Sequence, residues 1–459
     1  VDSLRGRLTD ILLEGLGDRR TRLVLADGRL SLHVETLRSA AAVRWNGTDD
    51  SHIWDFGVSE NFLNGDKKDY SAPGDDVTFD DRAASTQVEV KGAVRPASLL
   101  FTNDTKAYTL SGDSIVSPAT LRKTGAGTLT VASLNRMAST EVSGGRLVVN
   151  SLGNLTGVAY GALGTAASRI TLSGGATFGV ARTIITDQPF FIGSGGATFE
   201  TPGGTALTLN RGLAGAGNTV TKTGDGTLTL GTVNTIDRLV IARGTVNDVE
   251  LYNQPQLPAT VEFGQGTLYD PATENSSSVN PVNFVVPEGC TGTFHADPRC
   301  NYTGRLTGRG TFNVYDAWVR CTFSGDWSDF EGTVVPRLEN RTTKHLYTNE
   351  TFDFTNSHGL PRATLNVPSG VTVSNNGHDF PLGSVTGAGT LAGSGAWIVG
   401  VLGNDFNFGV VSTSKVVKRG AGRMNLSFAN KVQGQLQVDE GMLSFTSGTA
   451  TPIIGSTLT

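Results

Sequence analysis

The sequence Lys-Thr-Gly-Ala-Gly-Thr-Leu-Thr-Val at residues 123–131 decides the fold, because the chain repeats it. Close copies stand at residues 222–230 and 418–426, and shorter copies keep only the glycine pair and the residues after it. A second glycine-containing phrase follows each full copy, at Gly144-Gly145, Arg243-Gly244 and Glu440-Gly441. The glycine pairs of the copies are Gly125 and Gly127, Gly224 and Gly226, Gly308 and Gly310, Gly387 and Gly389, and Gly420 and Gly422.

Each copy combines a turn with a strand. A Gly-x-Gly pair lets the backbone adopt positive φ and turn tightly without a clash at Cβ. The residues after it alternate between polar and apolar, as in Thr128-Leu129-Thr130-Val131, which is typical of a β-strand. A unit of ~20–25 residues is too short to bury its own apolar face, so neighbouring units must stack. The repeats therefore predict an all-β body of stacked short strands.

Length and composition agree with this prediction. The chain has 459 residues, which is long for one globular core. Glycine contributes 59 of the 459 residues, roughly 13 %, whereas an average protein has about 7 %. Charged residues make up only 17 % of the chain. A hydrophobic fraction of 38 % suffices for a packed interior and argues against disorder. We expect one stacked body rather than several globules.

Charge and hydropathy exclude some classes of partner. No stretch approaches ~18 consecutive apolar residues, so we expect no membrane insertion of this chain. A net charge of −5 argues against nucleic acid. Residues 49–81 are strongly acidic, and the remainder of the chain is slightly basic. Because the chain begins at Val1 rather than Met, we expect a processed product.

The first residues give two local predictions. Leu8, Ile11, Leu12 and Leu16 fall at helical spacing, so residues 8–16 are either a short helix or two short strands around a turn. Residues 23–37 alternate around Asp27-Gly28, which predicts a hairpin or a rung turn. The solenoid is thus expected to begin with a short N-terminal helix or strand cap.

The repeated phrase resembles the autotransporter-associated β-strand repeat of bacterial surface proteins. The segments Trp45-Asn46-Gly47, Ile53-Trp54-Asp55, Glu60-Asn61-Phe62 and 73–81 are similar to the Trp-rich lead-in of that family. Residues 323–332 resemble a variant phrase of such proteins from Bacteroidota. The resemblance covers most of residues 45–446, fits poorly at 250–300 and 335–380, and includes no C-terminal outer-membrane barrel. It implies a right-handed parallel β-helix.

The resemblance also implies a domain order and a role. The expected order is N-terminal rungs or a cap at 1–44, an acidic Trp-rich lead-in with the first rungs at 45–122, and the repeat β-helix at 123–459. The implied role is a non-catalytic structural or adhesive stalk, extracellular or on the outer-membrane surface of a bacterium. Expected partners are further repeats or other copies stacked on the open β-helix ends, and glycans or surfaces of a host or neighbouring cell. A self-assembling filament or surface-layer subunit, and a polysaccharide lyase or hydrolase, are the alternatives.

The acidic segment offers the one metal hypothesis. Asp75, Asp76, Asp80 and Asp81 could supply oxygen ligands to Ca²⁺, although their spacing does not match an EF-hand loop. The alternative is that these carboxylates cap turns, as in Pro73-Gly74-Asp75. No other cofactor is expected.

The three cysteines are candidates for a disulfide. Cys300 and Cys321 are about one rung apart, and stacked positions lie ~4.8–5.5 Å apart, within the Cα range of a disulfide. Cys290–Cys300 is a second possible pair, and three buried thiols are the alternative. A bridge would suit an oxidising compartment outside the cell.

The remaining polar and aromatic candidates are scattered. His295 with Asp297, and His378 with Asp379, are the nearest approaches to an acid–base pair for the enzyme alternative. Short matches to the O-glycosylation signal of Bacteroidota stand at 2–4 and 113–115. The tryptophans are expected to fill rung corners or cover ends rather than to stack on sugars; they are Trp45, Trp54, Trp318, Trp327 and Trp397.

Overall fold

The computed structural model describes residues 19–48, 52–231, 234–248, 258–271, 279–296, 300–316, 321–338, 351–426 and 431–445. Every regular element in these ranges is a β-strand, and nearly all strand pairs are parallel. The predicted all-β solenoid of parallel strands is therefore confirmed. The residues of the possible N-terminal helix, 8–16, lie outside the described ranges.

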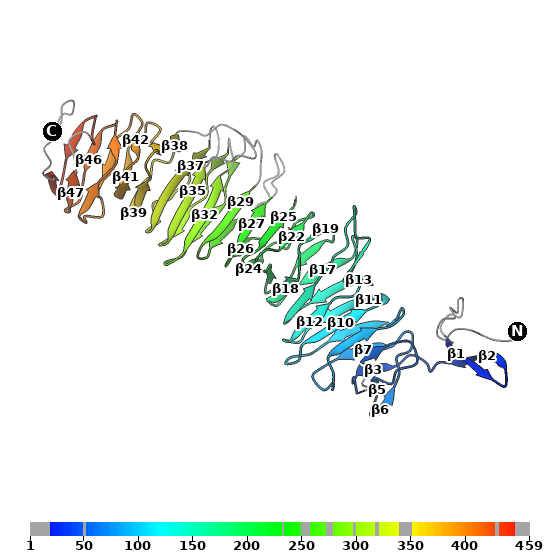
Figure 1. The fold of residues 1–459 in the computed structure, drawn as a ribbon. Helices are drawn as coiled ribbons and strands as arrows, with labels where there is room; N and C mark the ends of the chain where they lie inside the picture. The colour runs from blue at the N-terminus through cyan, green and yellow to red at the C-terminus, as the bar shows by residue number, and fades with distance from the viewer. Residues whose placement is uncertain are drawn as a thin grey trace. The chain divides into compact units, whose positions relative to one another are not determined.

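The chain divides into two compact units, Val1–Phe191 and Ile192–Thr459. The boundaries predicted after residues 44 and 122 both fall inside the first unit and stay predictions. Figure 1 shows the strands of each unit as arrows that lie side by side. We call one turn of the solenoid a rung.

The first unit has two main sheets. One contains β4 (Ile53–Trp54), β8 (Gln87–Val90), β10 (Tyr108–Gly112), β12 (Thr128–Val131), β14 (Arg146–Val149) and β18 (Ala176–Val180). The other contains β6 (Lys67–Asp69), β5 (Phe62–Asn64), β3 (Ala42–Trp45), β7 (Asp76–Phe79), β9 (Ser98–Phe101), β11 (Val116–Lys123), β13 (Arg136–Val142), β17 (Arg169–Leu172) and β20 (Phe190–Ile192). Antiparallel pairs are β1 (Arg19–Ala26) with β2 (Arg29–Thr36), β3 with β5, β5 with β6, and β15 (Tyr160–Gly161) with β16 (Gly164–Thr165). A further strand, β19 (Ile184–Thr186), is the end strand of another sheet, whose next strand is β22 (Ala206–Leu209).

The second unit has longer stacks. One sheet contains β21 (Ala197–Glu200), β24 (Thr219–Thr223), β26 (Arg238–Ile241), β28 (Thr260–Phe263), β31 (Asn283–Val286) and β34 (Leu306–Gly308). The next contains β22 (Ala206–Leu209), β25 (Thr227–Leu230), β27 (Thr245–Asp248), β29 (Thr267–Pro271), β32 (Thr291–Ala296), β35 (Thr311–Asp316), β37 (Thr333–Leu338), β39 (Leu360–Val367), β41 (Phe380–Gly387), β43 (Trp397–Val399), β46 (Val416–Lys418) and β48 (Leu436–Val438). A third sheet contains β30 (Val279–Asn280), β33 (Asn301–Tyr302), β36 (Thr322–Phe323), β38 (Thr351–Phe354), β40 (Thr372–Ser374), β42 (Thr390–Ala392) and β45 (Val411–Ser412). A fourth sheet contains β44 (Phe406–Phe408), β47 (Arg423–Leu426) and β49 (Met442–Phe445). The short β23 (Leu213–Ala214) completes the unit.

The alternation of the sequence places one side of each strand in the core. In β25 the side chains of Leu228 and Leu230 are fully buried, while Thr227 and Thr229 are partly exposed. The parallel register sets Leu228 beside Val246 of the next rung. A slip of one residue would turn each buried leucine outward, so burial fixes the register of the whole stack.

Aromatic side chains fill the start of the solenoid. Trp45, Trp54 and Phe62 are fully buried, with ring centroids 5.2 Å apart for Trp45–Phe62 and 5.8 Å for Trp54–Phe62. Phe79 stacks on Phe101 of the next rung at 4.4 Å. Trp327 and Trp397 are also fully buried, which confirms the structural role expected for these tryptophans. Trp318 lies outside the described residues.

Candidate functional site

Three buried lysines mark the repeat in the structure. Lys123, Lys222 and Lys418 stand just before their Gly-x-Gly turns, and each has no exposed surface. The sequence shows a basic residue at these places, but it gives no reason to expect the residue inside the molecule. Lysines are among the residues that are rarely buried unless their ammonium group has partners. The structure provides those partners.

The partners are backbone carbonyl oxygens from two neighbouring rungs. Lys222 Nζ donates to the carbonyl oxygens of Thr223 at 2.9 Å, Gly224 at 2.7 Å and Arg243 at 3.1 Å. We call this arrangement a lysine cage. It joins the Gly-x-Gly turn of one rung to the second phrase of the next, so it explains why the two phrases recur together.

Lys418 makes the same set of contacts, and Lys123 shares the contact within its own turn. Lys418 Nζ donates to the carbonyl oxygens of Arg419 at 2.8 Å, Gly420 at 2.6 Å and Glu440 at 3.3 Å. Lys123 Nζ donates to the carbonyl oxygen of Gly125. Burial lowers the pKa of Lys123 and Lys222 from 10.5 to about 8, and it lowers the pKa of Lys418 as well.

The glycine pairs are required by close packing more than by backbone angle. The first glycine adopts positive φ at Gly224, Gly308, Gly387 and Gly420, but Gly125 and the second glycine of each pair do not. A Cβ added to Gly226 would instead overlap carbonyl oxygens of the preceding rung. The explanation from turn conformation alone is thus incomplete, and the second glycine is there because the rungs approach so closely.

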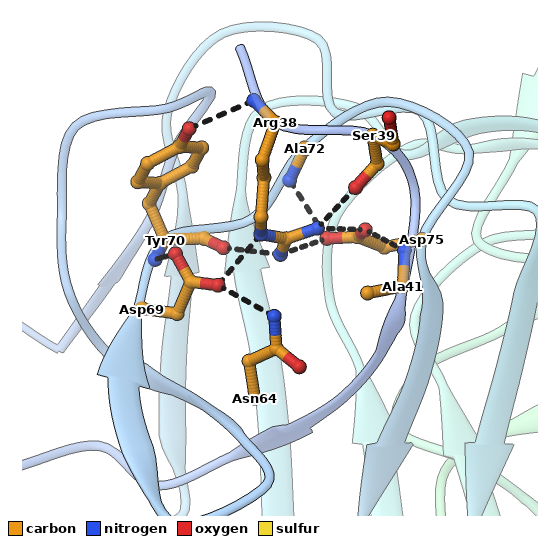
Figure 2. A network of polar contacts seen from close by, with 8 residues as sticks. All are labelled: Arg38, Ser39, Ala41, Asn64, Asp69, Tyr70, Ala72 and Asp75. Atoms are coloured by element: carbon orange, nitrogen blue, oxygen red, sulfur yellow. Dashed lines mark hydrogen bonds and ion pairs between the residues drawn. The ribbon is translucent and has the colours of Figure 1, made fainter.

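The acidic lead-in is held by arginine rather than arranged around a cavity. Figure 2 shows Arg38, just before the first rung, between Asp69 and Asp75. Its guanidinium donates to both carboxylate oxygens of Asp75, at 2.7 and 2.9 Å, and to Asp69 at 2.6 Å. Asp75 is fully buried and also accepts from the backbone N–H groups of Ala41 and Ala72. These hydrogen bonds, above all the one to Asp75, raise the pKa of Arg38.

The other three predicted calcium ligands face different partners. Asp76 accepts from Ser98 Oγ at 2.5 Å, and Asp80 accepts from Arg82. Asp81 accepts from the backbone N–H groups of Lys106, Asp104 and Thr105, which lower its pKa to about 2. The described residues contain no group of three or more histidine, cysteine or acidic side chains that could hold a metal ion. The geometry therefore favours the turn-capping interpretation, and calcium binding has no support from the described residues.

The structure brings together two of the three cysteines that were candidates for a disulfide. Cys300 and Cys321 are buried and directly precede β33 and β36, whose register pairs Asn301 with Thr322. The N–H group of Thr322 donates to the carbonyl oxygen of Cys300 at 3.0 Å, so the two cysteines occupy stacked positions. Cys290 is half-buried in a turn that begins at Pro287. A Cys300–Cys321 bridge stays a prediction, and the stacking favours it over Cys290–Cys300.

The two expected histidine–aspartate pairs stay predictions. Asp297 lies outside the described residues, and Asp379 accepts from the N–H group of Ala396. His295 instead has its Nδ1 atom 3.3 Å from Asp270, one rung earlier. Among the glycosylation matches, residues 2–4 lie outside the described ranges, and the match at 113–115 stays a prediction.

A surface loop at residues 150–168 was not among the elements expected from the sequence. This loop is held from both sides by buried amides: Asn135 Nδ2 donates to the carbonyl oxygen of Ala162 at 2.8 Å, and Gln188 Nε2 donates to those of Leu163 and Ser168. Two grooves of about 540 and 470 Å³ flank the loop. A signal that could have found it is the run of glycines at 153, 157, 161 and 164, which interrupts the alternation of the strands.

No helix in the described ranges could cross a membrane. No solved structure matches the chain significantly.

Comparison with known proteins identifies the repeat. The passenger-associated-transport-repeat family model matches residues 121–149 and 220–247, which contain two of the three buried lysines, Lys123 and Lys222. The adhesin BmaC autotransporter of Brucella suis biovar 1 (strain 1330) is 29 % identical over 342 residues, or 71 % of this chain. The match covers 10 % of that adhesin, so the chain spans only a small part of the length of this relative. The chain is thus similar to an autotransporter adhesin over most of its length, and two of its repeats match the passenger-associated-transport-repeat family.

Proposed function

We propose that the chain is a non-catalytic adhesive stalk of a bacterial cell-surface or secreted protein. The observation that carries the proposal is the likeness of 71 % of the chain to an autotransporter adhesin, on a body built of stacked rungs. A solenoid stacks each rung only on its neighbours, so its length can grow without a larger core. Such a body suits a spacer that carries contact surfaces away from a cell.

The proposed stalk would bind its partners through loops and would need no cofactor. We expect the working surfaces to be loops that leave the rungs, because loops on a rigid scaffold vary without disturbing the stack. Partners would be surface molecules of a host or neighbouring cell, including glycans, and further rungs or copies would stack on the solenoid ends. Since the acidic lead-in is held by arginine and backbone N–H groups, the stalk would work without bound calcium.

The test is display of this chain on a non-adherent bacterium, fused to an outer-membrane anchor. Cells that display it should adhere to cultured cells or matrix-coated surfaces several-fold more than cells with the anchor alone. Adhesion should persist after removal of divalent cations with EDTA. Equal display without added adhesion would overturn the proposal, as would depolymerisation of a polysaccharide panel by the purified chain. Reversible assembly into filaments would favour the surface-layer alternative.

A further inference from the structure

An exposed apolar surface surrounds the 150–168 loop of the first unit. Leu155 is 73 % exposed, Ile185 54 % and Val158 39 %, and Tyr160 is also exposed. The loop and β19 are joined directly, since Asn154 Nδ2 donates to the carbonyl oxygen of Ile185 and the N–H group of Leu155 donates to Asp187. We call residues 150–168, with Arg136, Arg182 and Ile185, the loop platform. Clustered apolar exposure on a fixed scaffold is typical of a binding surface.

The platform is fixed in place rather than loosely attached. Asn135 and Gln188 are buried and hold the loop backbone from the rungs on either side. Thr186 Oγ1 also donates to the carbonyl oxygen of Gly153 at 2.7 Å. A rigid surface loses little conformational entropy when it binds, so its apolar side chains can contribute fully to affinity.

The platform includes the edge of a sheet. The sheet that starts with β19 has no strand on the side of the loop. In the parallel ladders of this solenoid, residues with outward side chains donate their N–H groups to the preceding rung, as Thr227 does to Thr205. Ile185 has an outward side chain, and its carbonyl oxygen already faces the loop, where it accepts from Asn154. The N–H group of Ile185 therefore faces the same edge, and no partner for it is found among the described residues.

Each groove beside the loop carries one arginine and no acidic side chain. The 470 Å³ groove is lined by Leu152, Val158, Ile184 and Ile185, with Arg182 at its edge. Arg182 uses Nε to bond the carbonyl oxygen of Asn150, which leaves its terminal nitrogens for another group. The 540 Å³ groove includes Arg136, whose guanidinium lies 4.4 Å from the ring centroid of Tyr160. The two grooves thus combine apolar walls with positive charge.

We propose that the loop platform binds an extended peptide segment of a partner protein that carries apolar side chains and at least one carboxylate. The peptide backbone accepts from the N–H group of Ile185, an apolar side chain packs against Val158 and Ile185, and a carboxylate pairs with Arg182 or Arg136. The single hydrogen bond at the sheet edge orients the peptide backbone, while the two grooves provide most of the affinity and the specificity. The inference rests on the adhesive role proposed above and names the class of partner.

The experiment uses a phage library of random twelve-residue peptides, selected on the purified full chain. Enriched peptides should share a carboxylate flanked by apolar residues. Their affinity should fall about tenfold in Arg182→Gln or Arg136→Gln, the loss of one charge-assisted contact. Arg122→Gln is the matched control, because Arg122 is an exposed outward arginine whose partner is Glu141, away from both grooves. It should leave affinity within about twofold.

A second pair of variants tests the sheet edge. Ile185→Pro removes the N–H group and should abolish peptide binding, whereas Ile185→Thr keeps it and should weaken binding only through lost apolar contact. Hydrogen exchange of the Ile185 amide should slow when peptide is bound. The inference is overturned if no peptide is enriched, if the variants bind enriched peptides like the wild type, or if the platform proves to bind a glycan or a second copy instead. Adhesion of displaying cells that survives such a result would leave the proposed function intact.

Discussion

Lys222 donates to three buried carbonyl oxygens, two beside its own Gly-x-Gly turn and one, that of Arg243, in the next rung. We expect Lys222→Met to destabilise the surrounding rungs by about 1–3 kcal/mol, the usual cost of leaving buried polar groups without a partner. Lys91→Met is the matched control, because Lys91 is exposed, and its effect should stay within about 0.5 kcal/mol. Urea unfolding of the three proteins measures both values. Equal stability of wild type and Lys222→Met would show that the cage does not support the turn.

The cages also predict a pH dependence. Burial lowers the pKa of folded Lys123 and Lys222 to about 8, against 10.5 as the ordinary value. Below pH 8 the folded chain carries buried charges, whereas between pH 8 and 10.5 it has released protons that the unfolded chain still holds. Stability should therefore rise with pH in this window. The neutral amines keep N–H donors, so the turns stay bonded.

The measurement is thermal unfolding between about pH 7.5 and 9.5, compared with the Lys123→Met/Lys222→Met double variant. The window stops there because burial raises the pKa of Tyr108 above its ordinary value of 10.0, which makes stability fall once unfolded tyrosine ionises. The wild type should gain stability across the window relative to the double variant. Parallel curves for the two proteins would contradict the assignment.

Asp75 and Asp76 are neighbours with opposite environments. Asp75 is fully buried against Arg38, so Asp75→Asn should cost about 3–5 kcal/mol locally by removing the buried one of the two carboxylates that pair with this arginine. Asp76 is exposed and bonds only Ser98, so Asp76→Asn should cost less than about 1 kcal/mol. Amide hydrogen exchange at Ala41 and Ala72 reports the difference. Similar losses in both variants would refute the buried-pair interpretation.

These residues can be recognised in the sequence, but their partners cannot. Lys123, Lys222 and Lys418 could be seen beside their glycines, yet the third carbonyl oxygen of a cage comes from the next rung. The same holds for Asp75, because Arg38 lies 37 residues earlier. Such contacts depend on the register between rungs, and the repeat fixes that register only after the chain has folded.

At the scale of the element, the second glycine of a turn tests how closely the rungs approach. Gly226→Ala should destabilise by about 1–3 kcal/mol, since its Cβ would overlap carbonyl oxygens of Thr201, Pro202 and Thr205. Gly203→Ala in the preceding rung is the control. Its Cβ would meet only Asp225 Cβ at 3.7 Å, so it should be neutral or slightly stabilising. Equal unfolding midpoints for the two variants would refute the close-packing explanation.

Short sequence patterns predict an element correctly where the turn contains residues that favour positive φ. Asp27 and Gly28 adopt φ of 51° and 70°, and they join β1 to β2 as the alternation of 23–37 predicts. The loop at 150–168 was missed because its shape depends on Asn135 and Gln188, two buried amides that lie outside it. In the sequence, an Asn or Gln side chain near a strand cannot be distinguished from one that points to solvent, because its buried partners lie in other rungs.

At the scale of the whole molecule, stacked rungs should unfold locally rather than all at once. Each rung contacts only its neighbours, so a lesion weakens a few rungs and not the entire chain. We expect Asp75→Asn to raise hydrogen exchange within residues 38–101 of the first unit, and Gly226→Ala to raise it around β22–β27 of the second. Peptide-level exchange measurements on the full chain separate the two regions. Loss of protection throughout the chain in either variant would mean that the protein unfolds as one cooperative body, and the nearest-neighbour account of its stability would fail.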